Sequence, residues 1–454
     1  MVRAIITWSL HNRLVVLLGT VLLVVAGLAC AWDLNVEAYP DPTPPLVEVI
    51  TQNAGASPEE MERLIGIPIE IALNGMPGLH HLRSTTMAGL SDIKCVFTYT
   101  TDYWKARQEV INRIALITNL PTGVTPTLSP WSPTGEIVRY VLEGPQYTLN
   151  ELKAVQDWVL ERQLKTVPGV IDVTGFGGTV KQYQVLVDPH QLPHYNITLQ
   201  QVEDAISKSN ANIGGDILTL GSQSHNVRGI GLLGRGIDPL EPANAPRRAE
   251  LVEQKLEDIN NVVITQYHGN PILVKHVAKV VESYQPRLGI IGRDEGSKKE
   301  NDVVQGIVLM RKYEKSLPVS EAVLKKIEDI NKAKLLPPGM RIKIFNQRTE
   351  LVHVTRYNVL HNMLVGMGLV ILILFVFLGD LASAGIVALM IPLALLFSVM
   401  VIYVQGKSAN LLSIGAVDFG IIVDSSTIIV ENIYRHITAH DADRSRPLID
   451  RIID

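Results

Sequence analysis

The chain has little cysteine and little net charge. It holds only 2 cysteines among 454 residues, Cys30 and Cys95, and neither has the Cys or Cys/His spacing of a zinc site. We therefore expect no disulfide framework and no structural zinc. The formal net charge of −4 at pH 7 offers no basic surface for nucleic acid, so no nucleic-acid partner is expected.

Charged residues are scarce and hydrophobic residues abundant. Only 19% of the residues are charged, whereas 47% are hydrophobic. This composition is typical of a membrane protein with a large soluble part. The length is too great for one ordinary core, so several domains are expected.

Long apolar runs predict four membrane-spanning helices. A spanning helix needs about 20 consecutive apolar residues. A cleaved signal peptide is the alternative for the first run, because Arg3 and Arg13 precede it. The second and third runs are separated only by Gly379 and Asp380, which predicts a hairpin. The four runs are Leu14–Trp32, Val359–Leu378, Leu381–Val404 and Leu411–Ile433.

Basic residues predict the orientation of these helices. Arg3 and Arg13 flank the first run, and Arg435 and further arginines follow the fourth. Because basic residues concentrate in cytoplasmic segments, both ends are predicted to face the cytoplasm. Asp33–Arg356 then forms a large extracytoplasmic domain.

The extracytoplasmic part is predicted to repeat a β-α-β-β-α plan. A strand at Leu46–Gln52 precedes Ser57-Pro58-Glu59-Glu60, which has the residues of a helix capping box with proline at the first helical position. Thr148-Leu149-Asn150-Glu151 begins the same pattern again. Met76-Pro77-Gly78 and Val167-Pro168-Gly169 occupy equivalent places after the two helices. The pattern predicts two units of the split βαβ plan.

The limits of the two copies follow from the order of the predicted strands. We expect the first copy to end with a strand at Glu136–Glu143, and the second to contain strands at Val170–Phe176 and Gln182–Val187. A half-copy returns later, with strands at Val303–Met310 and Arg341–Phe345.

The segment Ile213–Glu300, between the second copy and the half-copy, is richer in Gly, Pro and charge. We interpret it as an inserted subdomain, of a kind that commonly carries partner contacts. It includes Gly234–Arg248, which is predicted to be an exposed hairpin or loop.

Three carboxylates, Asp418, Asp424 and Glu431, lie in the fourth apolar run. A charged carboxylate near the middle of a spanning helix costs roughly 2.5–3.5 kcal/mol, so a function must retain it there. Desolvation raises a carboxylate pKa, which lets such groups exchange protons near neutral pH. The alternative for the two aspartates is hydrogen bonding to neighbouring helices, and for Glu431 it is a position at the membrane interface. An intramembrane aspartyl protease is disfavoured, because its two aspartates face each other from different helices.

Around these carboxylates the chain resembles the heavy-metal branch of the resistance-nodulation-division (RND) exporters, which includes cobalt-zinc-cadmium pumps. The resemblance lies in Asp418-Phe419-Gly420-Ile421-Ile422-Val423-Asp424, running on to Val430-Glu431-Asn432. Multidrug members carry two consecutive aspartates, whereas Ser425 follows Asp424 here. Ser425-Ser426 departs from the Gly-Ala common in metal pumps. Other similar segments are Tyr39-Pro40-Asp41, Thr101–Arg107, Val167–Val170, Gly177-Gly178, Val187-Asp188-Pro189 and Gly306–Arg311.

The resemblance implies the fold and the division into domains. The chain is expected to be the N-terminal half of such an exporter. Its fold class would be an α-helical membrane protein with a large α+β extracytoplasmic domain, made of ferredoxin-like split βαβ porter subdomains and an inserted docking subdomain. The expected domains are 1–32 (cytoplasmic N-terminus and first transmembrane helix), 33–212 (porter subdomains), 213–300 (docking insertion), 301–356 (returning porter segment), 357–433 (transmembrane helices two to four) and 434–454 (a truncated cytoplasmic segment).

The resemblance also implies a function. The protein would be a secondary transporter and not an enzyme, and would expel zinc, cobalt, cadmium or nickel cations by proton antiport without a cofactor. Asp418, Asp424 and Glu431 would carry the protons. It would be a multi-pass homotrimer of the bacterial inner membrane with its large domain in the periplasm, joined to a periplasmic adaptor and an outer-membrane channel. A multidrug or organic-solute exporter and a membrane-anchored assembly module remain the alternatives.

Candidate metal ligands are few. Glu136 and Asp172 correspond to positions where zinc-pump relatives place acidic ligands, and the alternative is that both are solvated carboxylates at strand ends. His80 and His81 are expected on opposite faces of a strand. Pro193 is expected to prevent the helical geometry that would align His190 with His194. Both pairs are therefore interpreted as surface histidines.

Overall fold

The computed structural model describes residues 2–34, 36–37, 43–130, 135–287, 289–296, 299–378, 381–406, 408–410 and 427–433. The chain forms two compact units. The first comprises Met1–Thr134, Tyr313–Pro318 and Arg348–Asp454, and the second comprises Gly135–Lys312 and Val319–Gln347.

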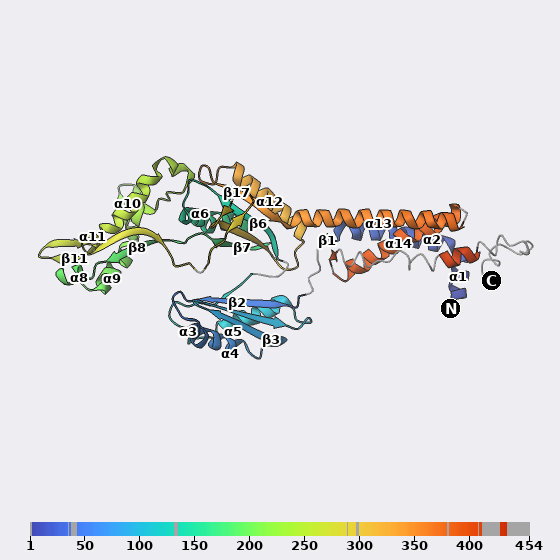
Figure 1. The fold of residues 1–454 in the computed structure, drawn as a ribbon, viewed down its shortest axis with the longest axis horizontal. Helices are drawn as coiled ribbons and strands as arrows, with labels where there is room; N and C mark the ends of the chain where they lie inside the picture. Colours follow the sequence, from blue (N-terminus) through green and yellow to red (C-terminus); the bar gives the residue numbers. More distant parts are fainter. Residues whose placement is uncertain are drawn as a thin grey trace, which may run out of the picture. The chain divides into compact units, whose positions relative to one another are not determined.

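The soluble part of the first unit is a four-stranded antiparallel sheet of order β3-β4-β2-β5. Its helices cover one face of the sheet (Figure 1). Val49 of the sheet packs in one core with Ile65 and Val110, which come from the two helical segments. The strands are β2 (Leu46–Gln52), β3 (Leu79–Met87), β4 (Leu90–Phe97) and β5 (Thr127–Leu128). The helical segments are α3 (Pro58–Met61), the π-helical turn Glu62–Gly66, α4 (Ile67–Leu73) and α5 (Tyr103–Ile114).

The second unit contains a sheet with the same plan, of order β17-β6-β16-β7. Tyr140, Leu160 and Ile327 meet in its core and come from the sheet and from both helical segments. Its strands are β6 (Glu136–Glu143), β7 (Val170–Gly177), β16 (Val304–Met310) and β17 (Arg341–Gln347). Its helical segments are α6 (Leu149–Val155), the π-helical turn Gln156–Leu160, α7 (Glu161–Lys165) and α12 (Ser316–Lys332).

Both predicted capping boxes are confirmed. The hydroxyl of Ser57 accepts a hydrogen bond from the Glu60 amide at 3.3 Å, and the Glu60 carboxylate accepts one from the Ser57 amide at 2.8 Å. Thr148 and Glu151 make the same reciprocal pair, at 3.4 and 2.8 Å. These bonds satisfy amides that the first helical turn leaves without partners.

A tight turn with a proline-glycine pair follows helical segments in both sheets. Gly78, Gly169 and Gly339 have φ values of +74°, +89° and +85°. In each case the amide after the glycine donates to the carbonyl three residues earlier, at 3.0–3.1 Å. Glycine is favoured there because other residues rarely adopt a positive φ.

The predicted limits of the two copies are wrong. Glu136–Glu143 is a strand, but it is the first strand of the second sheet, where it pairs with β16 and β17. β16 also pairs with β7, so the expected half-copy completes the second sheet. The strand predicted at Gln182–Val187 is β8 (Lys181–Val187), which pairs with β13 (Ala278–Tyr284) instead of β7. Pairing over long sequence separations leaves no local pattern, which explains the error.

The segment between β7 and β16 folds around the β8–β13 ribbon. Its remaining main elements are α8 (Gln191–His194), α9 (Leu199–Ser209), β9 (Ile213–Leu220), β10 (Gln223–Gly229), α10 (Arg248–Asn260), β11 (Val263–Tyr267), β12 (Asn270–Leu273), α11 (Val274–Val277), β14 (Arg293–Asp294) and β15 (Lys299–Glu300).

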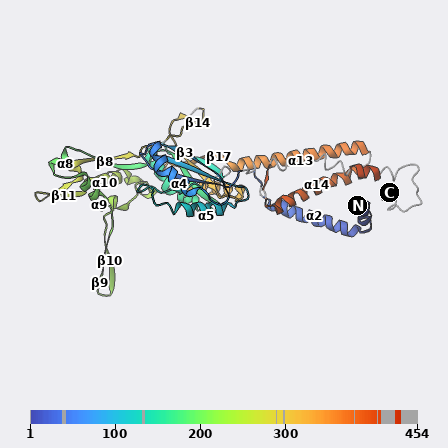
Figure 2. The same ribbon diagram turned by 90° about the horizontal axis from the view of Figure 1, so that it is seen from below.

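The exposed hairpin of this segment is β9–β10, which projects from its surroundings (Figure 2) and is exposed at every residue of both strands. Gly234–Arg248, expected to be an exposed hairpin or loop, is a loop and not a hairpin. That stretch instead contains the 3₁₀ turns Leu233–Gly236 and Pro242–Arg247.

Outside the first sheet, the described part of the first unit consists mainly of helices, most of them long and apolar. Among the described residues, Arg13–Asp33 and Gly385–Val404 are long and apolar enough to cross a membrane. The predicted bounds Leu381–Val404 coincide with α14, and the second predicted span lies within α13. Of the fourth predicted span, only 427–433 are described, as helix. The helices are α1 (Val2–His11), α2 (Arg13–Asp33), α13 (Arg348–Leu378) and α14 (Leu381–Val404).

Candidate functional site

The predicted proton relay lies mainly outside the described residues. Asp418 and Asp424 belong to the part of the chain that the structure does not describe, and Glu431 lies on the helical segment 427–433. The relay therefore stays a prediction. The apolar parts of the first unit that the structure does describe are its long helices and the residues at their ends.

Two apolar helices pack closely through a glycine. A Cβ atom on Gly27 of α2 would lie 2.7 Å from the Cβ of Leu396 on α14. Small residues permit such close approach between helices in a membrane. Most other side chains of α2 are exposed, including Leu14, Leu18 and Leu22, as expected of a surface that faces lipid.

A buried carboxylate joins the start of two helices to the strand after α2. Glu37, which is 7% exposed, belongs to β1 (Val36–Glu37), and β1 pairs with β18 (Ala409–Asn410). Its oxygens accept hydrogen bonds from the Ser316 amide at 3.1 Å and the Ser316 hydroxyl at 2.6 Å. The Arg348 guanidinium forms an ion pair with one Glu37 carboxylate oxygen at 3.1 Å. A negative charge is favourable at the N-termini of α12 and α13, where the helix dipoles are positive.

A second contact joins the ends of α2 and α14. Lys315 binds the Asp33 carboxylate at 2.6 Å, and the Tyr403 hydroxyl donates to the same carboxylate at 3.1 Å. We call Asp33, Glu37, Lys315, Ser316, Arg348 and Tyr403 the helix-end junction. No local pattern in the sequence indicates this junction, because its members are far apart along the chain and look like ordinary polar residues beside apolar runs.

The two predicted metal ligands are brought into register on one sheet. Glu136 of β6 and Asp172 of β7 both lie opposite Leu309 of β16, one on each side. Glu136 forms an ion pair with Arg139, and Asp172 forms one with Lys165 at 2.5 Å. Each carboxylate thus already has a cationic partner, and their role as metal ligands stays a prediction.

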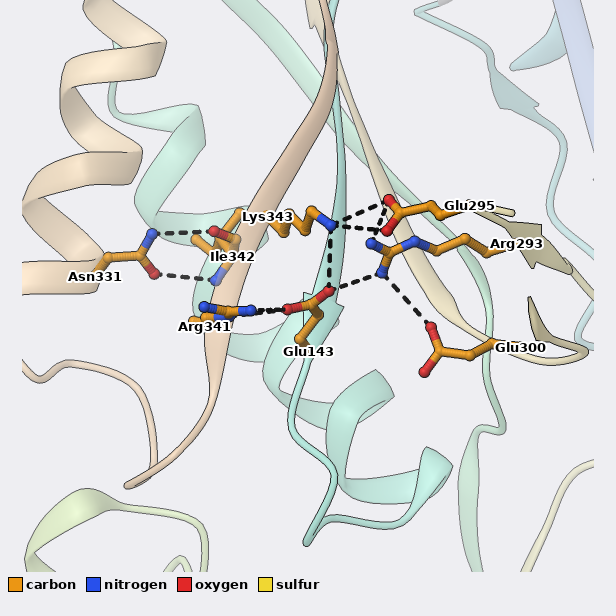
Figure 3. Close-up of polar contacts among 8 residues, drawn as sticks. All are labelled: Glu143, Arg293, Glu295, Glu300, Asn331, Arg341, Ile342 and Lys343. Atoms are coloured by element: carbon orange, nitrogen blue, oxygen red, sulfur yellow. Dashed lines mark hydrogen bonds and ion pairs between the residues drawn. The ribbon is translucent and has the colours of Figure 1, made fainter. Parts of the chain in front are cut away.

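The second unit also holds a network of charged side chains at the end of β6 (Figure 3). The Glu143 carboxylate binds Arg293 at 2.8 Å and Arg341 at 2.7 Å, and Lys343 and Arg293 both bind Glu295. Burial of Glu143 disfavours its charge, but the hydrogen bonds from Arg293 and Arg341 outweigh this and lower the pKa of Glu143. The network fastens β14 to the edge of the second sheet.

An asparagine holds the same edge strand from its other side. The Asn331 amide group on α12 donates to the Ile342 carbonyl at 3.1 Å and accepts from the Ile342 amide at 3.0 Å. Figure 3 shows this pair beside the charged network. β17 is therefore fixed in position just before the chain enters α13 at Arg348.

All four histidines of the two pairs are exposed, as interpreted, but the structure corrects the expected geometry of both pairs. A bulge in β3 brings the Nδ1 atoms of His80 and His81 within 2.8 Å of each other, although opposite faces were expected. Pro193 lies inside the short helix α8, because a proline in the first helical turn removes no hydrogen bond. The described residues contain no group of three or more His, Cys, Asp or Glu side chains placed to hold a metal ion.

A protein-family model supplies the decisive comparison. Residues 5–449 match the AcrB/AcrD/AcrF family model. The chain belongs to the AcrB/AcrD/AcrF family. This is a family of RND transporters and not of enzymes, and the resemblance to RND exporters drawn from the sequence is confirmed.

Relatives of this AcrB/AcrD/AcrF family chain include heavy-metal resistance proteins. It is 36% identical to Protein HelA of Legionella pneumophila over 446 residues, which are 96% of this chain and 40% of HelA. It is 35% identical to the cobalt-zinc-cadmium resistance protein CzcA of Cupriavidus metallidurans over 459 residues, which are 99% of this chain and 41% of CzcA. The chain thus spans about two fifths of the length of these relatives.

A solved structure agrees with the family assignment. The fold matches a crystal structure of a heavy metal efflux pump with a TM-score of 0.80 and 38% identity, covering 95% of this chain and 41% of that one. The chain is therefore related to heavy-metal efflux RND transporters.

Proposed function

We propose that this chain works in an RND exporter that expels zinc, cobalt, cadmium or nickel cations and is driven by protons. The observation that carries the proposal is the similarity to a cobalt-zinc-cadmium resistance protein over 99% of the chain. The region of similarity includes the apolar stretch with Asp418, Asp424 and Glu431. Ser425 after Asp424 supports a metal over an organic substrate, because multidrug members have a second aspartate there.

In this proposal Asp418, Asp424 and Glu431 take up and release protons as their surroundings alternate between wet and dry. Carboxylates in membrane helices mark proton paths because only a function offsets the free energy of burying them. Protonation neutralises a buried carboxylate, so it changes the electrostatic free energy of the helix that carries it.

The helix-end junction is the proposed route by which that change leaves the membrane. Glu37 ties the starts of α12 and α13 to the strand after α2, and Asp33 ties the ends of α2 and α14 through Lys315 and Tyr403. The chain passes directly from β17 into α13, since Gln347 and Arg348 are consecutive. The chain itself therefore links α13 to the edge strand of the second sheet.

The two sheets are the proposed porter subdomains. Each has the strand order of a ferredoxin-like split βαβ unit, with two helical segments on one face. The insertion, expected at 213–300, is the proposed docking subdomain. Because β8 pairs with β13, we extend it to include β8 and α9.

The proposed assembly is a homotrimer in the bacterial inner membrane, with an adaptor and an outer-membrane channel bound in the periplasm. The β9–β10 hairpin supports a protein contact, because an isolated two-stranded hairpin is marginally stable in water. Its exposed apolar side chains include Ile217, Leu218 and Leu220. A neighbouring copy that covers these side chains would stabilise it.

Glu136 and Asp172 are the proposed acidic metal ligands. Carboxylate oxygen suits zinc, cobalt and nickel better than copper(I). Because Arg139 and Lys165 now hold these carboxylates, metal binding requires both ion pairs to open. Metal entry would then be coupled to a rearrangement at the end of the second sheet.

The test is Asp424→Asn in the exporter that contains this chain, expressed in a metal-sensitive host. We expect metal resistance to be lost while expression and trimer assembly persist, because asparagine cannot carry a proton. Ser425→Ala is the matched control and should retain resistance. Retained resistance in Asp424→Asn contradicts proton coupling, and resistance to organic compounds without metal resistance contradicts the substrate.

A further inference from the structure

The paired histidines of β3 lie on an exposed edge. β3 is an edge strand of the first sheet, and both His80 and His81 are exposed. Leu79 lies opposite Phe97, and His81 lies opposite Val96, so His80 is the extra residue of a β-bulge. Leu79 and Leu82 on either side both pack against the core. The bulge therefore turns both imidazoles to the outside together.

The two imidazoles approach each other through their Nδ1 atoms. The Nδ1 atoms are 2.8 Å apart, and the rings meet edge to face with centroids 5.1 Å apart. A metal ion binds imidazole nitrogen at about 2.0–2.1 Å, so two such bonds at a right angle place the nitrogens about 2.9 Å apart. Only a small separation of the rings is needed to admit an ion between them.

We propose that His80 and His81 form a two-ligand site for a divalent transition-metal ion of the zinc, nickel, cobalt or copper(II) type. Imidazole nitrogen is a preferred ligand for these ions and a poor one for magnesium or calcium. Water completes the coordination, so the site exchanges its ion readily. It is separate from Glu136 and Asp172, which belong to the second sheet.

Without metal, the 2.8 Å contact is a hydrogen bond in which one neutral imidazole donates and the other accepts. Metal binding requires both Nδ1 atoms to be free of protons. Metal binding therefore replaces the hydrogen bond between the two rings and displaces its proton to solvent.

The test measures Cu²⁺ and Zn²⁺ binding by the purified 454-residue chain in detergent. Electron paramagnetic resonance of the first Cu²⁺ bound should show coupling to two imidazole nitrogens. His80→Ala and His81→Ala should each remove one nitrogen and weaken Zn²⁺ binding about tenfold, because the second ligand of a chelate acts at high effective concentration. His225→Ala, an exposed histidine on β10, is the matched control and should change neither.

Unchanged affinity and spectrum in both single variants overturn the proposal and leave a hydrogen-bonded pair. A measurement without substitutions guards against altered folding. Zn²⁺ should protect His80 and His81 of the unmodified chain from carbethoxylation at pH 7, as read by peptide mass spectrometry. Equal modification with and without Zn²⁺ also overturns the proposal. Neither readout needs transport, so failure here leaves the proposed proton drive untouched.

Discussion

The two sheets share a strand order but differ in how their second and third strands are joined. In the first sheet, β3 and β4 are joined by a short turn with Gly89 at φ +72°. In the second, the corresponding strands β7 and β16 are separated by a whole folded segment. The core of each sheet nevertheless closes in the same way. The second sheet therefore keeps its strand register across a large insertion.

Most of the insertion is closed by the β8–β13 ribbon, which leaves only the segment with β14 and β15 before β16. β8 and β13 pair from Ala278 opposite Val187 to Tyr284 opposite Lys181, and the Gln285 amide donates to the Val180 carbonyl at 2.9 Å. The two ends of the ribbon are thus about one strand spacing apart, near 4.8 Å. The host sheet is held at two adjacent points, so the loop-closure entropy depends little on the length of the insertion.

The largest effect on stability is expected in β16, a central strand of the second sheet. A Cβ atom on Gly306 would lie 2.2 Å from the ring of Tyr140, which is fully buried and donates to Gln156 at 2.9 Å. We expect Gly306→Ala to lower the free energy of unfolding by about 3 kcal/mol, because a rigid ring in a packed core cannot move aside. Denaturant unfolding of the chain in detergent measures it.

Gly214→Ala is the control for this substitution. Gly214 lies on β9, and a Cβ there would meet no described atom within 4 Å. It should change the free energy of unfolding by less than about 0.5 kcal/mol. Tyr140→Leu in the Gly306→Ala background should recover part of the loss by removing the clash. Equal stability of Gly306→Ala and Gly214→Ala would show that the second sheet is not packed as described.

The charged network at Glu143 is the next test, since it fastens β14 of the inserted segment to the second sheet. Glu143→Gln removes the charge of one carboxylate that binds Arg293, whose side chain is only 9% exposed, and leaves its ion pair with Glu295 in place. We expect a loss of about 2 kcal/mol, because hydrogen bonds between charged groups contribute more than neutral ones. Glu328→Gln, which removes an exposed i,i+4 ion pair on α12, is the control and should cost under about 0.5 kcal/mol.

The contribution of Glu143 to the free energy of unfolding should decrease as the pH falls. Its pKa in the folded chain is lowered from 4.5, because the hydrogen bonds from Arg293 and Arg341 outweigh the effect of burial. A lowered pKa stabilises the fold above the unfolded value, and this stabilisation is lost as the pH falls through the folded value. The difference in unfolding free energy between the unmodified chain and Glu143→Gln should therefore be constant near pH 7 and shrink below about pH 4.5. A difference that grows on acidification would contradict this.

Local features could be predicted from the sequence, whereas long-range pairing could not. The strand bounds Leu46–Gln52 and Glu136–Glu143 and both capping boxes are confirmed, because each is set by residues within a few positions. The partners of β6, β8 and β16 depend on contacts across the insertion, and no periodicity records them.

The candidate site divides in the same way. The carboxylates in the fourth apolar run are visible in the sequence as charge inside an apolar stretch, and their role stays a prediction because Asp418 and Asp424 lie outside the described residues. The helix-end junction could not, since Glu37 and Ser316 are brought together only by the fold. The bulge that aligns His80 with His81 was also hidden, because an alternating pattern cannot show an extra residue.

The smallest predicted effect concerns the two helix caps, which have the same sequence pattern in both sheets. Ser57→Ala and Thr148→Ala each remove a helix cap with the same reciprocal hydrogen bonds. Both should cost about 1 kcal/mol, because each leaves one amide of the first turn without a partner. Hydrogen exchange by mass spectrometry should show faster exchange in α3 and the π-helical turn after it for Ser57→Ala, and in α6 for Thr148→Ala. Glu59→Ala, beside the first cap but outside its hydrogen bonds, is the control. If only one substitution accelerates exchange, the two helix starts contribute differently, and their shared sequence pattern does not imply shared energetics.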